Sequence, residues 1–117
     1  MEKRTYASYL EDNLPIPVEL PDGELAERVK LRRLTAKERR QLATSYKQDL
    51  ELLRAKIRMQ IVEFGPISAP IPPEILDNLD TLNEDFLIEA QAAIDRGFAT
   101  VSEFTSAVAE GKEQPFR

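Results

Sequence analysis

The sequence predicts a mainly helical α+β protein: a small N-terminal β-hairpin, one long central helix and several short C-terminal helices. Three observations predict this class. Apolar and polar residues alternate between residues 16 and 31, apolar residues then recur every three or four positions up to residue 64, and short capped helical patterns follow a proline-rich stretch. The 117 residues suffice for one compact domain and not for two ordinary ones. Its expected parts are an arm and hairpin (1–35), a long helix (36–64), a connector (65–73), short helices (74–111) and a tail (112–117).

The first 35 residues predict an arm followed by a hairpin. Tyr6, Tyr9 and Leu10 have helical spacing, so residues 1–14 form either a short helix or a loosely docked arm. Further on, apolar residues alternate with polar ones on both sides of a Pro-Asp-Gly turn at residues 21–23. A lone hairpin is marginal in water, so this one must pack against helices or another sheet.

The long helix is predicted by its start, its periodicity and its end. Thr35 and Glu38 have capping-box spacing, which places the first helical residue at Ala36, and Gly65-Pro66 is a typical helix stop. The apolar stripe between them consists of Leu42, Tyr46, Leu50, Leu53, Ile57, Ile61 and Phe64.

The length of this helix is a problem for a small domain. At about 1.5 Å per residue it would be about 43 Å long, whereas a compact chain of this size has a diameter of about 35 Å. Either the helix breaks near Thr44 and Ser45, or its exposed length packs against something else.

The C-terminal half predicts a connector and three short helices. Four prolines between residues 65 and 73 exclude a helix interior or a central strand, so this connector should be stiff and extended. Pro73 suits the first position of a short helix, and Asn83 can cap a second that ends at Gly97. Thr100 has a glutamate three residues later and should open a last helix, which Gly111 closes. The tail, residues 112–117, should be frayed.

Composition argues against most chemistry. The chain has no cysteine and no histidine, which removes disulfides, thiolate chemistry and the commonest general base and metal ligand. We therefore expect no enzyme activity, no cofactor and no metal site. The acids Asp77, Asp80, Glu84 and Asp85 lack calcium-loop spacing and are better explained as first-turn partners of helix dipoles. The sequence shows no signal peptide or membrane span, so we expect a cytoplasmic protein with no membrane partner.

Charge is strongly polarised along the chain. Residues 28–58 carry eleven basic and three acidic residues, whereas residues 59–117 carry three basic and eleven acidic ones. Nucleic acid is a poor candidate partner because the pI is about 4.8 and no aromatic residues interleave with the basic ones. Either the acidic helices fold back on the basic one, or the two charged faces serve association with another subunit or partner. On the long helix one angular sector is basic, with Arg40, Lys47, Arg54 and Arg58.

A second apolar face lies opposite the main stripe of the long helix. Either the short C-terminal helices cover this face, or it is a surface for a subunit or client. Leu52, Ala55, Met59 and Val62 form the face. The candidate partner-binding residues are therefore Leu52, Met59 and Val62 for apolar contact, with Arg40, Lys47, Arg54 and Arg58 for orientation.

The stretch ERVKLRRLTAKERRQL, with the turn before it, resembles the tail assembly chaperones of long-tailed bacteriophages. In that family a pattern "dG..v.lr.LT..e" often precedes the first long helix, and it is matched here by Asp22, Gly23, Val29, Leu31, Arg32, Leu34, Thr35 and Glu38. The resemblance covers residues 17–64. It implies a non-enzymatic protein of the host cytoplasm that covers apolar surface of the tape-measure and tail-tube proteins during tail building. We expect it to self-associate. The alternative is a small phage-encoded inhibitor or adaptor that binds a host protein, with its acidic half imitating nucleic acid.

Overall fold

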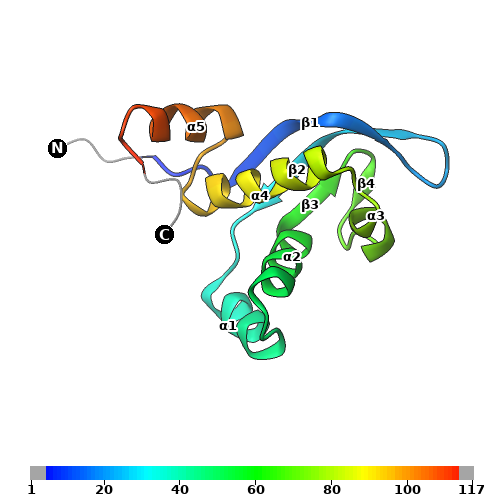
Figure 1. The fold of residues 1–117 in the computed structure, drawn as a ribbon, viewed down its shortest axis with the longest axis horizontal. Coiled ribbons are helices and arrows are strands. Elements are labelled where there is room, and N and C mark those ends of the chain that lie inside the picture. Colours follow the sequence, from blue (N-terminus) through cyan, green and yellow to red (C-terminus); the bar gives the residue numbers. More distant parts are fainter. Residues whose placement is uncertain (1–4, 114–117) are drawn as a thin grey trace.

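The computed structural model describes residues 5–113 and shows an α+β fold (Figure 1). Within this range a four-stranded antiparallel sheet, ordered β1-β2-β3-β4, is combined with five helices. The predicted mainly helical class with one long central helix is therefore wrong. The strands are β1 (Tyr9–Glu19), β2 (Leu25–Arg32), β3 (Ile61–Phe64) and β4 (Ile67–Ser68). The helices are α1 (Ala36–Ser45), α2 (Asp49–Gln60), α3 (Pro73–Asp77), α4 (Thr81–Asp95) and α5 (Val101–Ala109).

The N-terminal hairpin is present and longer than predicted. Strand β1 begins at Tyr9, which pairs with Arg32 of β2, and the register continues without interruption to Asn13. The helical alternative for residues 1–14 is therefore wrong from Tyr9 onward, and residues 1–4 lie outside the described range. The register shifts between Asn13 and Val18, so that β1 bulges where its two prolines, Pro15 and Pro17, lie.

The predicted long helix is two helices and a strand. Helix α1 starts at Ala36, as the capping box predicts, and ends at Ser45. Near this end the hydroxyl of Thr44 donates to the carbonyl of Arg40 (3.0 Å), a bond that slightly destabilises a helix. Serine, threonine and tyrosine are also mediocre helix formers, and acids in the first turn of α2 favour a new start at Asp49. Of the two alternatives that the helix length left open, the break is therefore the correct one, and it falls at residues 46–48, just after Thr44 and Ser45.

The last four residues of the predicted helix form β3. Ile61 and Val62 are β-branched and Phe64 is aromatic, which suits a strand. Ile61 pairs with Leu31, and Phe64 pairs with Val29, so β3 lies along the free edge of β2. Pairing with β2 on one side and β4 on the other supplies backbone partners to this segment, so the strand prevails over a helical continuation.

The turn after β3 requires glycine. Gly65 has a φ of +58°, and its N–H donates to the carbonyl of Arg28 (2.7 Å). A Cβ at this position would lie 2.5 Å from the Cα of Ala26. The turn therefore brings backbone against backbone, and Gly65-Pro66 ends a strand where the sequence predicted the end of a helix.

Helix α4 covers one face of the sheet and closes the core (Figure 1). Leu10, Leu31, Ile61 and Phe64 are fully buried on the sheet, and Ile94 is fully buried on α4. The opposite face is open and charged. There Lys30 lies 3.4 Å from a carboxylate oxygen of Glu11 and 4.5 Å from the ring centre of Tyr9.

The remaining C-terminal predictions divide. Pro73 does open α3, Thr100 does cap α5 by accepting from the N–H of Glu103, and Gly111 does follow the end of α5. The expected cap at Asn83 is wrong, because the cap of α4 is Asp80, three residues earlier, and the helix starts at Thr81. The connector contains the short edge strand β4, and residues 114–117 of the expected frayed tail lie outside the described range.

Asn83 instead closes the edge of the sheet. It is 1% exposed, accepts from the N–H of Ile16 (3.1 Å) and donates to the carbonyl of the same residue (2.9 Å). The side-chain amide thus takes the place of a neighbouring strand at the β1 bulge.

The molecule is elongated, with extents of 50 × 31 × 22 Å. Its Cα radius of gyration is 14.5 Å, against about 13 Å for a compact chain of this length. Figure 1 shows the reason: α1 and α2 project away from the sheet and its covering helices. None of the helices within residues 5–113 combines the length and the apolar content that a membrane crossing requires.

Candidate functional site

The candidate site is built on the projecting pair of helices, which we call the α1–α2 arm (residues 36–60). Leu42 is the buried residue of α1, and Ala55 is buried on α2. Both line one cleft together with Met59 of α2. Part of the second apolar face of the predicted helix is therefore covered by the helix's own first half, which folds back as α1. This is an outcome that neither sequence alternative included.

A charged cluster fixes the start of the arm. Both terminal nitrogens of the Arg32 guanidinium, Nη1 and Nη2, donate to the Glu38 carboxylate at 2.8 Å. The same carboxylate accepts from the N–H of Thr35 (2.9 Å), and the Thr35 hydroxyl accepts from the N–H of Glu38 (3.2 Å). The hydrogen bonds from Arg32, followed by those at Thr35, lower the pKa of Glu38 to about 2. Glu38 is therefore ionised at neutral pH and ties the end of β2 to the first turn of α1.

Gln60 fixes the other end of the arm. Its side chain is fully buried, and its amide donates to the carbonyl of Arg32 (2.9 Å) and to the Asp95 carboxylate (3.0 Å). Gln91 donates to the second oxygen of that carboxylate (2.5 Å). The end of α2 is thus bonded to β2 and α4 at one point. The Oε1 atom of Gln60 has no hydrogen-bond partner among the described residues.

Two clefts adjoin the arm. The first, called the arm cleft, has a volume of about 650 Å³ and lies between α1, α2 and the connector. The second, called the inner cleft, has a volume of about 190 Å³ and lies between α2, α3 and α4. The arm cleft is lined by Gln41, Leu42, Ser45, Tyr46, Ala55, Arg58, Met59, Ala69, Pro70 and Ile71. The inner cleft is lined by Tyr46, Glu51, Arg54, Ala55, Ile57, Arg58, Pro73, Leu76, Asp77, Leu79, Glu84 and Leu87.

The arm cleft has an apolar floor and a mixed rim. Leu42, Ala55 and Ile71 are buried, whereas Met59 is 37% exposed and Arg58 is exposed. Arg58 is the charged residue of this lining, so the cleft is apolar and cationic together. By contrast, the inner cleft carries three carboxylates beside its two arginines and is roughly balanced in charge.

The basic residues of the arm are largely unpaired. Between the basic and acidic segments of the chain, the described residues form one ion pair, in which Arg54 and Glu84 lie 3.4 Å apart. Both side chains of that pair are more than one third exposed, so it stabilises the fold by well under 1 kcal/mol. Within residues 5–113, no ion pair is formed by Lys37, Arg39, Arg40, Lys47, Lys56 or Arg58.

The structure separates the seven predicted site residues. Met59 and Arg58 line the arm cleft, and Arg54 and Arg58 line the inner cleft. Leu52 is half-buried on α2 and lines neither cleft. The others also line neither: Val62 lies in β3, Arg40 on α1 and Lys47 in the turn between the helices.

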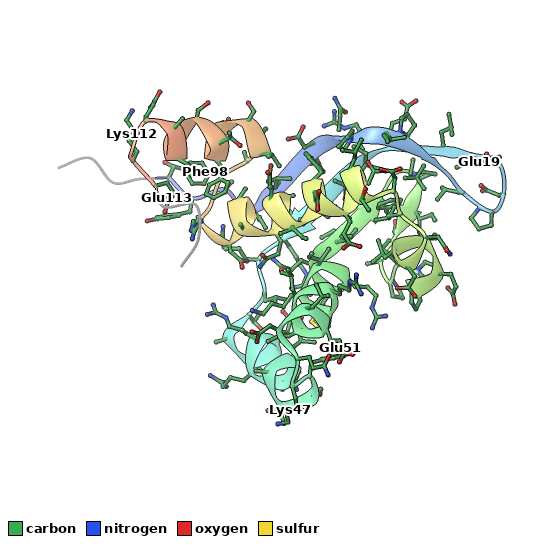
Figure 2. All side chains as sticks on the ribbon, in the orientation of Figure 1. Glu19, Lys47, Glu51, Phe98, Lys112 and Glu113 are labelled. Atoms are coloured by element: carbon green, nitrogen blue, oxygen red, sulfur yellow. The ribbon has the colours of Figure 1, made fainter. Side chains whose placement is uncertain are left out.

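The predicted stripes therefore do not exist as single faces. They were drawn on one continuous helix, and the turn at residues 46–48 and the strand β3 break both of them. Figure 2 shows Lys47 at the tip of the arm, next to Glu51.

Sequence reasoning missed the floor of the arm cleft. The sequence places Leu42 and Tyr46 in the apolar stripe of one continuous helix, and Pro70 and Ile71 in a stiff, extended connector. A signal was present, because the predicted helix was too long for the domain and the residues around 44–46 are poor helix formers. A helix that folds back at that point brings Leu42 and Tyr46 next to Met59.

Within the described range no three His, Cys, Asp or Glu side chains are grouped so as to hold a metal ion. No protein-family model, no curated protein and no solved structure matches this chain. The arm geometry and the sequence resemblance therefore have to support the functional argument.

Proposed function

We propose that this protein is a non-enzymatic tail assembly chaperone of a long-tailed bacteriophage. In the host cytoplasm it binds the tape-measure and tail-tube proteins, covers their apolar surface while the tail is built, and is then displaced. The single observation that supports this best is the arm cleft, an apolar hollow of about 650 Å³ whose rim residue Met59 is 37% exposed. A concave, mainly apolar surface with an exposed side chain at its rim is suited to contact with a partner.

The residues behind the resemblance have a physical role at this site. Val29 and Leu31 are buried in the sheet and hold β2 in place. Arg32, Thr35 and Glu38 then form the hydrogen-bonded cluster that sets the direction of α1. The matched pattern therefore describes the base of the arm. The long helix that the resemblance implies is absent, so the support comes from the hairpin and this junction.

The proposal is tested by coexpression with the tape-measure and tail-tube proteins of the same phage. We expect a complex that survives size-exclusion chromatography, with light scattering reporting the mass of the free protein as a self-associated species. Met59→Asp should abolish the complex, because a carboxylate at the rim cannot be buried against an apolar client without a large cost.

Leu50→Asp is the matched control. Leu50 lies on the same helix, is 52% exposed and lines neither cleft. The Leu50→Asp substitution removes an apolar side chain and adds the same negative charge as Met59→Asp, and it should leave the complex intact. Failure of the wild-type protein to bind either tail protein would refute the proposed function.

One observation favours the second candidate, an inhibitor or adaptor of a host protein. Glu74 and Asp77 of α3 and Asp85 and Glu89 of α4 are exposed and form no ion pair with any residue in the described part of the chain. A concentration of exposed carboxylates on these two helices resembles the phosphate charge of nucleic acid. Capture of a host nucleic-acid-binding protein, lost in Asp77→Lys with Asp85→Lys and retained in Met59→Asp, would favour this candidate.

A further inference from the structure

We propose that the arm cleft binds an acidic amphipathic helix of the partner, with apolar side chains on the cleft floor and carboxylates against the basic residues of the arm. This inference rests on the proposed function and names the chemistry of the client segment. The cleft volume of about 650 Å³ falls within the range of about 300–1,000 Å³ that is usual for ligand sites. It therefore offers room for several side chains of a docked segment.

The sheet edges argue against strand addition as the binding mode. Just before β1, the N–H of Ala7 donates to the carbonyl of Gly97 (2.8 Å), and within β1 the N–H of Glu11 donates to the carbonyl of Ala99 (3.3 Å). Further along β1, the side chain of Asn83 bonds both the N–H and the carbonyl of Ile16. The other edge strand, β4, is two residues long and lies between Pro66 and Pro70. Neither edge presents a row of free donors and acceptors.

A helix suits the cleft that remains. Its walls are the two helices of the arm and the connector residues 69–71, which together form a groove with an apolar floor. An amphipathic helix presents apolar side chains at positions i, i+4 and i+7 along one face, the usual pattern for groove binding. Leu42, Ala55 and Ile71 would contact those side chains, and Met59 and Tyr46 would flank them.

Charge complementarity selects an acidic partner. Residues 36–60 contain seven basic and three acidic residues, and Glu38 is already bound to Arg32. Arg58 lies in the cleft lining, and Arg39, Arg40 and Lys47 are close in sequence to the lining residues Gln41, Leu42 and Tyr46. Carboxylates on the flanks of a bound helix would meet this excess of positive charge and fix the orientation of the helix.

Two other occupants are less well supported. Nucleic acid would meet the cations of the arm, but it has no use for an apolar floor and would be repelled by a chain of net charge −5. A second copy of this chain could place its acidic helices α3 and α4 on the arm. Among the described residues of these two helices, however, Leu82 is the one large apolar side chain that is well exposed, so they offer little to fill the cleft.

The test uses the full chain and a fluorescein-labelled peptide of about 18 residues, with leucines at i, i+4 and i+7 and glutamates on both flanks. Fluorescence anisotropy should show a Kd on the order of 10 μM, weakening several-fold as NaCl is raised from about 50 to about 500 mM. Arg58→Glu should raise the Kd about tenfold, and Met59→Asp by more.

Lys112→Glu is the matched charge control. Lys112 lies beyond α5, 75% exposed, and Figure 2 shows it far from Lys47 at the arm tip. Its reversal changes the net charge as much as Arg58→Glu does and should leave the Kd unchanged. Circular dichroism confirms that each variant is folded.

Four results would overturn the inference. A lysine-flanked analogue that binds as tightly as the glutamate peptide would show that charge is irrelevant. If the peptide does not bind but the tail proteins do, the acidic helix is rejected while the proposed function stands. The two proposals can therefore fail separately. Absence of peptide binding together with self-association that Met59→Asp abolishes would assign the cleft to a second copy. Tight binding of labelled double-stranded DNA that Arg58→Glu abolishes would assign it to nucleic acid.

Discussion

Replacement of Gly65 by alanine should destabilise the fold through a single backbone contact. Gly65 joins β3 to β4, has a φ of +58° and lies against β2. An added Cβ would lie 2.5 Å from the Cα and 2.6 Å from the Cβ of Ala26. Neither atom is the end of a flexible side chain, so relief requires that β2 or the turn moves.

Gly23 supplies the matched control. It lies in the hairpin turn with a φ of +88°, and a Cβ there would meet nothing within 4 Å. Both substitutions cost about 1–2 kcal/mol for a left-handed alanine, and both reduce the entropy of the unfolded chain by the same amount. Overpacking adds about 1–3 kcal/mol at Gly65 alone. The expected losses are therefore about 1 kcal/mol for Gly23→Ala and about 2–4 kcal/mol for Gly65→Ala.

Urea unfolding followed by circular dichroism measures the difference. For slopes of about 1–3 kcal/mol per molar urea, an excess loss of about 2 kcal/mol moves the midpoint by about 1 M, and both variants should keep the wild-type slope. Equal losses of stability in the two variants would show that β2 yields without cost at Ala26, and the argument for a required close approach would be lost.

Two further substitutions test the polar junctions of the fold. Glu38→Gln should reduce stability at pH 7 by about 1–2 kcal/mol, a figure discounted for partial exposure. Because the folded pKa of Glu38 is lowered from 4.5 to about 2, its contribution is present above about pH 4.5 and is lost between there and pH 2. Urea midpoints of the variant and wild type should therefore converge near pH 2, and a pH-independent gap would contradict the linkage. Asn83→Asp should cost about 2–4 kcal/mol at pH 7, since an ionised carboxylate cannot donate to the carbonyl of Ile16. Burial should raise the pKa of the new acid, so the gap should narrow as pH falls toward 4, and an unchanged gap would exclude this cause.

Signals confined to one helical turn were predictable from the sequence. The capping box at Thr35 and Glu38, the cap at Thr100 and the first-turn proline Pro73 are all where the sequence places them. Each depends on hydrogen bonds or backbone angles within about four residues, so no knowledge of the tertiary fold is needed.

The conformation or role of a residue was not predictable where it depends on a partner far away in the sequence. Ile61 and Phe64 are three residues apart and fit a helix as well as they fit the bulged strand β3. The free edge of β2, about thirty residues earlier, decides between the two. Asn83 is a favourable cap residue by type, yet its partner is Ile16, which is 67 residues away. In both cases the sequence shows a residue suited to two environments, and only the assembled sheet selects one.

The floor of the arm cleft was also missed because it depends on residues brought together by the fold, whereas the charge of the arm could be counted from the sequence. The polarity counted along the sequence is carried into the fold as a basic arm, whose helix α2 meets the more acidic α3 and α4 at the inner cleft. Ion pairs within the chain neutralise little of this charge, since Arg54 and Glu84 form the one ion pair between the basic and acidic segments among the described residues. An exposed ion pair adds well under 1 kcal/mol to the stability of the fold, so this distribution of charge contributes little to folding. Repulsion between like charges on the arm also opposes a compact state. An excess of unpaired positive charge on the arm is what the proposed acidic partner would neutralise. The arm cleft, apolar at its floor and cationic at its rim, is where that compensation can occur.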